Sequence, residues 1–428
     1  MKKLLLLFVV FQTLILLTAS CVTNKEADVI RFWGMGVEGE AVGKLVAEFE
    51  KENPGVKVKV QMIPWTAAQE KLISAYASGN LPDVFQLGNT WIPQFKELDA
   101  LEKLNGYVLD SKTISQDSYF PGIWETNVIQ DGIYGIPWYI DTRVLFYRVD
   151  DLQKAGYSSA PASWKELYEV ARKIKSIKSD KNKYPIFLPT NDWSVFVIFG
   201  MQAGADLLTN DYTYGHFNSP EFKRAVNYLL KFYKNGLTPK GFTAFNNIYQ
   251  AMAEGYISMF ISGPWNIKEM KKWMKGNLKD KWMTSPLPAA DTNGIGVSLA
   301  GGSSIVMNSQ SGNKHTAWKL IEFLSRPTIQ LKFFRMVDDL PARREAWESP
   351  EIKRDKFIKA FFKQLNHVKP VPKVPEWERI AFSKIQKYME YIVYEKMSVE
   401  TALKKLDEEV NSVLEKRRWL IKHGRINE

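Results

Sequence analysis

The chain has 428 residues, of which 45% are hydrophobic and 25% are charged, a composition typical of soluble globular proteins. This length exceeds one ordinary domain and predicts two lobes of roughly 150–200 residues each. The formal net charge is +11, but the 58 basic residues are diluted by 47 acidic ones, so the charge does not favour a nucleic-acid partner.

The amino-terminal residues have the pattern of a secretory signal. Two lysines precede an apolar run over residues 4–17, and small residues at 18–20 lie directly before Cys21. The run is shorter than the roughly 20 residues that a membrane span requires. Cys21 is the single cysteine, and its position resembles that of the lipid-modified cysteine in the bacterial lipobox. Ordinary secretion with cleavage nearby is the alternative, and either outcome places the mature protein outside the cytoplasmic membrane.

Predicted strands and helices alternate over residues 29–87. Strands are expected at 29–33, 56–61 and 81–87, and the second of them alternates valines with polar residues at the period of a strand. One helix is expected up to Phe49, before Asn53-Pro54-Gly55, and a second from Thr66 to about Ser78. This order predicts an α/β lobe built on crossover units.

Polar and aromatic residues follow predicted strands at two places. Asn89-Thr90-Trp91 comes directly after the third strand, where ligands bind in open α/β sheets. The second place is the segment 134–141, which precedes a strongly β segment at 144–147 and ends in the lone carboxylate Asp141. Because a buried unpaired carboxylate is costly, Asp141 either lines a wet cleft or caps a turn.

The second half of the chain is richer in predicted helices. Ser163 and Glu166 form a capping box at a helix start, and another helix is expected at 222–235. An apolar strand from Met259 breaks at Gly263-Pro264 and delivers Trp265 to a helix start; a tryptophan of the core is the alternative for this residue. A strand at 304–307, a helix at 314–325 and a helix-rich tail follow.

Four segments resemble the family-one extracellular solute-binding proteins of bacterial ABC importers, the maltose- and trehalose-binding relatives. The segments are 32–49 with its turn Gly36-Val37-Glu38-Gly39, then 79–84, 135–147, and 261–265 followed by Ala300-Gly301-Gly302. The resemblance covers essentially the whole mature chain and rests on the order and spacing of the segments. It implies an α/β, periplasmic-binding-protein-like fold of two α/β lobes joined by three crossing segments, with the ligand cleft between the lobes.

The resemblance also implies a division of the chain. A signal peptide at 1–20 is followed by the lipid-attachment cysteine and a tether at 21–28. Lobe 1 covers 29–141, lobe 2 covers 142–285, a return to lobe 1 covers 286–326, and lobe 2 with the C-terminal helices covers 327–428. The crossings are expected near residues 141–143, 285–288 and 326–327.

The binding positions of the family imply a set of ligand-binding residues. Trp265 is the principal stacking residue of this set, and two glycines let the backbone approach the ligand. The chemistry agrees, because sugars present hydroxyls that carboxylates and arginine bind and apolar faces that tryptophan covers. The predicted set is Glu38, Trp65, Asn89, Trp91, Tyr139, Asp141, Trp193, Trp265, Gly301, Gly302, Arg343 and Trp377.

The function that the resemblance implies is solute capture for transport. The chain is expected to be the extracytoplasmic component of an ABC sugar importer, which closes its lobes on a di- or oligosaccharide and delivers it to the permease. We expect a lipid-anchored monomer with no enzyme activity, no cofactor and no nucleic-acid partner. Asn89-Thr90 replaces an acidic–basic pair of some relatives, so the identity of the sugar stays open.

Two other classes of function are alternatives. A secreted glycoside hydrolase needs two carboxylates that flank the bond, and nothing in the sequence pairs Glu38 with Asp141 in these roles. The second alternative keeps the fold but has another small solute as its ligand. A polyamine would need more acidic residues beside the aromatic ones than the sequence places there. The four histidines are scattered without metal-ligand spacing, and no Walker-type phosphate loop is present.

Overall fold

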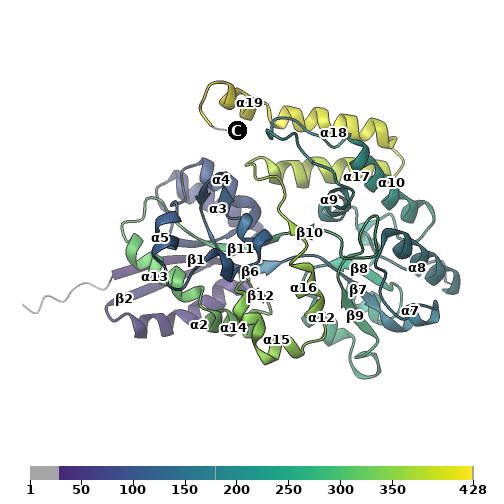
Figure 1. Cartoon of the computed structure of the whole chain (residues 1–428), viewed down its shortest axis with the longest axis horizontal. Helices are drawn as coiled ribbons and strands as arrows, with labels where there is room; N and C mark the ends of the chain where they lie inside the picture. Colours follow the sequence, from purple (N-terminus) through teal and green to yellow (C-terminus); the bar gives the residue numbers. More distant parts are fainter. Residues whose placement is uncertain (1–27, 179, 427–428) are drawn as a thin grey trace, which may run out of the picture.

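The computed structural model describes residues 28–178 and 180–426 of the chain. The expected signal peptide and Cys21 lie outside these residues. The described chain forms two α/β lobes, one built on a six-stranded sheet and the other on a three-stranded sheet (Figure 1). This architecture is the two-lobe α/β fold that the sequence predicts. None of the described helices is both long and apolar enough to cross a membrane.

The sheet of the first lobe is mixed and has the strand order β12-β6-β11-β3-β1-β2. The strand β1 is parallel to β2 and β3, whereas β11 is antiparallel to β3 and β6, and β12 is antiparallel to β6. Strands from three separate parts of the chain therefore build one sheet. Their bounds are β1 (Asp28–Met35), β2 (Val56–Ile63), β3 (Val84–Gly88), β6 (Ile136–Asp141), β11 (Gly301–Met307) and β12 (Leu340–Pro341).

Helices cover both faces of this sheet. On one face α2 (Gly36–Glu52) packs with α13 (Lys314–Leu324) and α14 (Pro327–Val337), and the rings of Phe49 and Phe323 lie 5.5 Å apart. On the other face α3 (Trp65–Ala77) and α4 (Ile92–Glu97) bury Leu72 and Phe95. The alternation of strand and helix up to β3 confirms the crossover units predicted for this lobe.

The second lobe is organised around the central strand β7 (Val144–Arg148). It pairs antiparallel with β8 (Met259–Ser262) on one side and β9 (Trp282–Ser285) on the other. Aromatic packing holds this sheet, since Phe146 stacks on Phe260 with ring centroids 4.7 Å apart. Helices from the middle and the end of the chain pack together around it, and α18 (Val399–Val413) contacts α10 (Pro220–Lys234).

The remaining helices and strands are short or lie outside the two main sheets. They are η1 (Asn89–Trp91), α5 (Asn105–Asp110), η2 (Gln116–Ser118), α6 (Pro121–Glu125), β4 (Val128–Ile129), β5 (Gly132–Ile133), α7 (Val149–Lys154), α8 (Trp164–Ile177), α9 (Trp193–Gln202), η3 (Phe242–Ala244), α11 (Ile248–Ala253), α12 (Asn266–Trp273), η4 (Gly276–Leu278), β10 (Ser298–Leu299), η5 (Arg344–Glu348), α15 (Pro350–Arg354), α16 (Lys359–Gln364), β13 (Val368–Lys369), the π-helical η6 (Arg379–Ile385), α17 (Gln386–Val393) and α19 (Glu415–Lys422).

The chain passes between the lobes at places that differ in part from those expected. It leaves the first sheet after Asp141 and enters the second at Val144, and it returns from the end of β9 to the start of β11. The expected division places residues 327–341 in the second lobe, but in the structure they belong to the first lobe. Instead, α14 packs on α2, and β12 pairs with β6 (Figure 1). The last passage therefore lies beyond β12, because α16 packs on β7 and β9.

Candidate functional site

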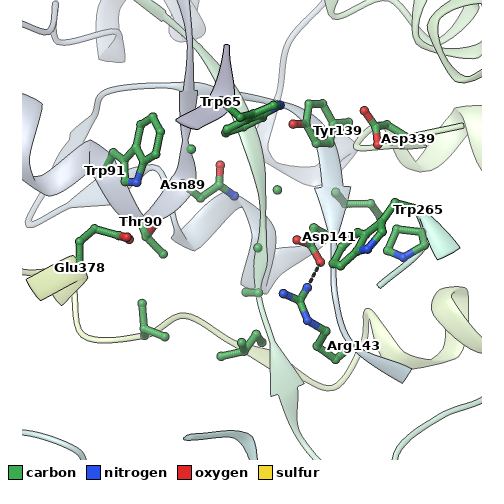
Figure 2. Close-up of a pocket in the computed structure, with 18 of the residues that line it drawn as sticks. Trp65, Asn89, Thr90, Trp91, Tyr139, Asp141, Arg143, Trp265, Asp339 and Glu378 are labelled. Atoms are coloured by element: carbon green, nitrogen blue, oxygen red, sulfur yellow. Dashed lines mark hydrogen bonds and ion pairs between the residues drawn. The ribbon is translucent and has the colours of Figure 1, made fainter. Parts of the chain in front are cut away.

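A cavity of about 460 Å³ lies where the two lobes meet (Figure 2). Its wall on the first lobe is formed at the ends of β1, β3 and β6, and its wall on the second lobe at the start of α9, the turn after β8 and the segment 371–382. In open α/β sheets this edge is the usual place for a ligand, because the strand ends open into a crevice there.

The turns that follow the strands of the first lobe position four side chains in the cavity. Glu38 lies in the first turn of α2, directly after β1, and is 7% exposed. Asn89 and Trp91 lie in η1, directly after β3. Trp65 at the start of α3 contacts the Trp91 ring edge-on, with ring centroids 6.0 Å apart. Short connections between strand and helix thus place polar and aromatic groups at one edge of the sheet.

Trp265 comes from the second lobe and lies open to the cavity. Its side chain is 42% exposed, so the alternative of a core tryptophan is wrong. The strand β8 ends at Ser262, and the side chain of Asn266 donates hydrogen bonds to Ser262 Oγ at 2.8 Å and Gly263 O at 2.9 Å, which holds the turn. A Cβ atom at Gly263 would lie 1.9 Å from the Trp265 ring. The glycine therefore lets the indole fold back over the turn.

A chain of hydrogen bonds orients Glu38. Its carboxylate accepts from Trp65 Nε1 at 3.3 Å and from the Tyr139 hydroxyl at 3.2 Å. That hydroxyl accepts from Gln86 Nε2 at 3.1 Å, and Gln86 Oε1 accepts from the backbone of Met35 at 2.7 Å. Burial raises the pKa of Glu38, and these hydrogen bonds oppose the rise because they stabilise the charged form.

Four carboxyl groups line the cavity: Glu38, Asp141, Asp339 and Glu378. Burial is the main cause that raises the pKa of each of them. Asp141 pairs with Arg143, and the neighbouring side chains of Thr90 and Trp91 oppose the rise in the pKa of Glu378.

Asp339 differs from the other three carboxyl groups. In the described part of the chain it has neither a hydrogen bond nor an ion pair, and its pKa lies well above the ordinary value. Repulsion by Glu38 and Asp141 adds to the effect of burial. The cavity is therefore acidic and holds one carboxylate that the protein itself does not satisfy.

Asn89 has an unsatisfied donor at the same cavity. It is 5% exposed, and its Oδ1 accepts from Ser304 Oγ at 2.9 Å. Its Nδ2 is buried and has no hydrogen-bond partner among the described residues. In Figure 2 this nitrogen faces the space enclosed by the labelled side chains. Buried amides are nearly always paired, so a free one marks a place for a ligand acceptor.

The structure brings together most of the residues predicted to bind a ligand. The residues of the predicted set that line the cavity are Glu38, Trp65, Asn89, Trp91, Tyr139, Asp141, Trp193, Trp265, Gly301 and Gly302. Their contact with a ligand stays a prediction.

Two residues of the predicted set, Trp377 and Arg343, do not line the cavity. Trp377 is fully buried and supports Trp193 from behind, with ring centroids 5.6 Å apart and an interplanar angle of 81°. Arg343 is 5% exposed and donates to Thr113 O at 2.6 Å and Ser325 O at 3.1 Å. Both side chains are engaged inside the protein, which corrects their predicted role.

Gly301 and Gly302 are needed where two strands of the sheet approach each other closely. Gly302 has φ +128°, and a Cβ atom there would lie 2.2 Å from the Tyr139 carbonyl oxygen. At Gly301 the corresponding atom would lie 2.9 Å from the Asp141 carbonyl oxygen. These glycines let β11 approach β6 closely where the ladder shifts register after Ser303. They shape the cavity by holding the strand that carries Tyr139 and Asp141.

The predicted set lacks several residues of the cavity. Arg143 follows Asp141 by two residues, a spacing that places both side chains on one side of an extended segment and could have indicated it. Asp339, Glu378 and Phe382 reach the cavity from distant parts of the chain and had no local signal. Across residues 28–178 and 180–426, no group of three or more His, Cys, Asp or Glu side chains could hold a metal ion.

Comparisons with known proteins agree on one family. A model of the bacterial extracellular solute-binding proteins matches residues 44–360. A structure of the sugar-binding protein MalE from Xanthomonas citri is 43% identical, with a TM-score of 0.89, covering 92% of this chain and 99% of that one.

More distant proteins are similar over nearly the same length. A solute-binding protein from Thermotoga lettingae, solved with α-D-tagatose, is 26% identical with a TM-score of 0.74, covering 90% of this chain and 100% of that one. The galactooligosaccharide-binding protein of Bacillus subtilis is 23% identical over 373 residues, which cover 85% of this chain and 84% of that protein.

Proposed function

The chain belongs to the bacterial extracellular solute-binding proteins, and we propose that it is the component of an ABC importer that captures a di- or oligosaccharide. The cavity between the lobes carries this proposal. Aromatic side chains face it from both sides, Trp65 and Trp91 from the first lobe and Trp193 and Trp265 from the second. Such walls cover the apolar faces of sugar rings, and a few polar groups between them fix the hydroxyls.

Closure of the lobes is the proposed mechanism of capture. The residues that link β6 to β7 lie between Asp141 and Val144, beside the cavity, so a small change in their backbone angles moves one aromatic wall toward the other. A saccharide held between the walls stabilises the closed form because it contacts both lobes at once. The closed, loaded form is then what the permease receives.

The proposed place of work is the extracytoplasmic face of the cell membrane. Membership of the extracellular solute-binding family supports this location. We further propose that Cys21 carries a lipid anchor and that the protein acts as a monomer; the lysines and apolar run before Cys21 support the anchor.

Saccharide binding is tested by a thermal-shift screen against mono-, di- and oligosaccharides, followed by calorimetry on those that act. A ligand that binds only the native state raises the Tm. At a ligand concentration of 100 times the Kd, the native state is stabilised by about 2.7 kcal/mol. We expect shifts with at least one di- or oligosaccharide, and small-angle scattering that reports a smaller radius in its presence. A panel in which no saccharide shifts the Tm or gives heat would refute the proposal.

We propose that the chain binds saccharides without cleaving them, since the relatives compared above are named as binding proteins. Prolonged incubation with the saccharide found in the screen, followed by chromatography, is the check. Cleavage products that the purified wild-type protein forms, and that the Glu38→Gln variant does not form, would indicate a hydrolase instead.

A further inference from the structure

We propose that the captured saccharide carries a positive charge, and that Asp339 binds its protonated amine. This inference rests on the proposed function and names the class of sugar, an amino sugar, that the same cavity takes. It starts from the balance of charge in the cavity and from two polar groups there that have no partner.

The charges that line the cavity do not balance. The four carboxyl groups Glu38, Asp141, Asp339 and Glu378 face the single guanidinium of Arg143, and no lysine or histidine lines the described wall. Arg143 is already paired with Asp141. Three carboxyl groups therefore remain without a cation of the protein. The sequence predicts too few acidic residues beside the aromatic ones for a polyamine. This prediction is wrong, because Asp339 and Glu378 also line the cavity.

Nearby donor groups distinguish Asp339 from the other two carboxyl groups. Glu38 accepts hydrogen bonds from Trp65 and Tyr139, and the side chains of Thr90 and Trp91 beside Glu378 favour its charged form. Asp339 has no such donor among the described residues and lies close enough to Glu38 and Asp141 for repulsion. A sugar hydroxyl would give it one hydrogen bond but would leave its charge. An ammonium group gives both a donor and a compensating charge, which makes the stronger contact.

The backbone directs Asp339 into the cavity rather than to solvent. The helix α14 ends at Asp338, which adopts a left-handed conformation with φ 63°. This turn sends Asp338 to the surface, where it pairs with Lys268 at 2.9 Å, and leaves Asp339 at the cavity beside Tyr139 (Figure 2). Two adjacent aspartates thus have opposite surroundings: one has its own lysine, and the other lines the cavity without a cation.

The free amide of Asn89 favours a ligand that carries an acceptor over a bare polyamine. Its Nδ2 is buried without a partner among the described residues and can only donate, so it suits an oxygen atom of the ligand. A fully protonated polyamine has donors and no acceptor. An amino sugar has an ammonium group for Asp339, oxygen atoms for Asn89, and apolar ring faces for Trp265 and Trp65. These requirements together favour a charged saccharide.

The test compares matched ligands that differ in charge. Two disaccharide skeletons, cellobiose and trehalose, are titrated by calorimetry as the neutral sugar, the 2-amino sugar and its N-acetyl derivative, at about pH 7, where amines next to polar groups are largely protonated. We expect the amino form of at least one skeleton to bind tenfold or more tightly than its two uncharged forms. The difference should shrink at high salt, because salt screens the attraction.

Variants assign the preference to one carboxylate. Asp339→Asn keeps the size of the side chain and should lower the affinity for the amino form to that for the neutral sugar. Asp338→Asn is the matched control and should keep the preference, since its carboxylate pairs with Lys268 at the surface.

Each contrary result overturns a different statement. If the neutral forms bind as tightly as the amino form, the inference that the ligand is charged is wrong, and the proposed function still stands. Spermidine binding without binding of any saccharide would overturn both. If Asp339→Asn weakens neutral and amino forms equally, the assignment of the amine to Asp339 is wrong.

Discussion

The guanidinium of Arg143 lies over the Trp265 indole, 4.6 Å from the ring centroid, while it also pairs with Asp141. Asp141 is the last residue of β6, and Arg143 is the last residue before β7, so both belong to the passage between the lobes. Trp265 belongs to the second lobe. The contact therefore connects Trp265 of the second lobe to the passage between the lobes, the segment that bends in the proposed closure.

Trp265→Ala is predicted to weaken saccharide binding by about ten- to hundredfold, because the ligand loses a stacking surface and Arg143 loses its contact. The Tm should change little, since the indole is 42% exposed. Trp419→Ala removes a tryptophan that is 54% exposed in α19, outside the cavity, and serves as the matched control. Calorimetry on both variants decides the matter; an unchanged Kd in Trp265→Ala would show that the ring does not contact the ligand.

The parts of the site that the sequence predicted are those with a local signal. Trp265 follows a strand and a Gly-Pro turn, and Asn89 and Trp91 follow a buried strand, so the chain around each residue indicates its place at a cleft. Asp339 had no such signal, because α14 returns to the first lobe and only tertiary packing brings its end to the cavity. Glu378 likewise arrives with the C-terminal helices.

The predictions from the sequence that proved wrong also have physical explanations. The family resemblance implies a passage between the lobes near Arg326-Pro327, where one helix is expected to end. Proline is also favoured at a helix start, and here it begins α14, which stays on the same lobe as α13. The resemblance implies a ligand contact for both Trp193 and Trp377, but the sequence does not show which of these two neighbouring indoles faces the cavity. Packing places Trp193 in front and Trp377 behind.

Gly302→Ala is predicted to destabilise the protein by about 3 kcal/mol or more, because φ +128° is strained for alanine and its Cβ would lie 2.2 Å from the Tyr139 carbonyl oxygen. Relief of this clash requires β11 to move away from β6, so binding should weaken too. Gly43→Ala is the control: it is exposed in α2, its Cβ would meet nothing within 4 Å, and alanine should stabilise the helix by roughly 0.5–1 kcal/mol. Equal Tm values for the two variants would contradict the strain argument.

Arg343→Ala is predicted to lower stability by about 2–4 kcal/mol and to leave the Kd for the saccharide unchanged. The side chain bonds to the partly buried carbonyl group of Thr113 and the buried one of Ser325, which would both lose their donor. Urea unfolding measures the first effect, and calorimetry well below the Tm measures the second. Arg344→Ala, at an exposed neighbouring position, should change neither quantity. A large loss of affinity with normal stability would return Arg343 to the ligand site.

Cys21→Ser is predicted to move the protein from the membrane fraction to the soluble extracytoplasmic fraction, because the hydroxyl of serine cannot receive a thioether-linked lipid. Fractionation of cells that express each form, followed by detection of the protein, measures this. Ser20→Ala keeps a small residue before the cysteine and should stay with the membrane. Retention of Cys21→Ser in the membrane fraction would argue against a lipid anchor at this residue.

The last prediction concerns the free energy of unfolding without ligand as a function of pH. Burial, then repulsion by Glu38 and Asp141, raises the pKa of Asp339 well above its ordinary value, so the native state binds this proton more tightly than the unfolded chain does. Stability contributed by the group is therefore full below the unfolded pKa, near 3.9, and falls as the pH rises toward the folded pKa.

Asp339→Asn removes that loss of stability because asparagine stays neutral. Its Tm should exceed that of the wild type by about 1 °C or more near pH 8, which corresponds to roughly 1 kcal/mol for a chain of this size, and the gain should vanish near pH 4. Scanning calorimetry of the two proteins across this range is the measurement, with Asp338→Asn as control. Because Asp338 pairs with Lys268 and is the last of the causes that raise the pKa of Asp339, its replacement should raise the Tm near pH 8 less than Asp339→Asn does. A wild type that is as stable as Asp339→Asn near pH 8 would mean that the carboxylate is already compensated in the free protein, and the cavity would then have no charge left for an amine to neutralise at this position.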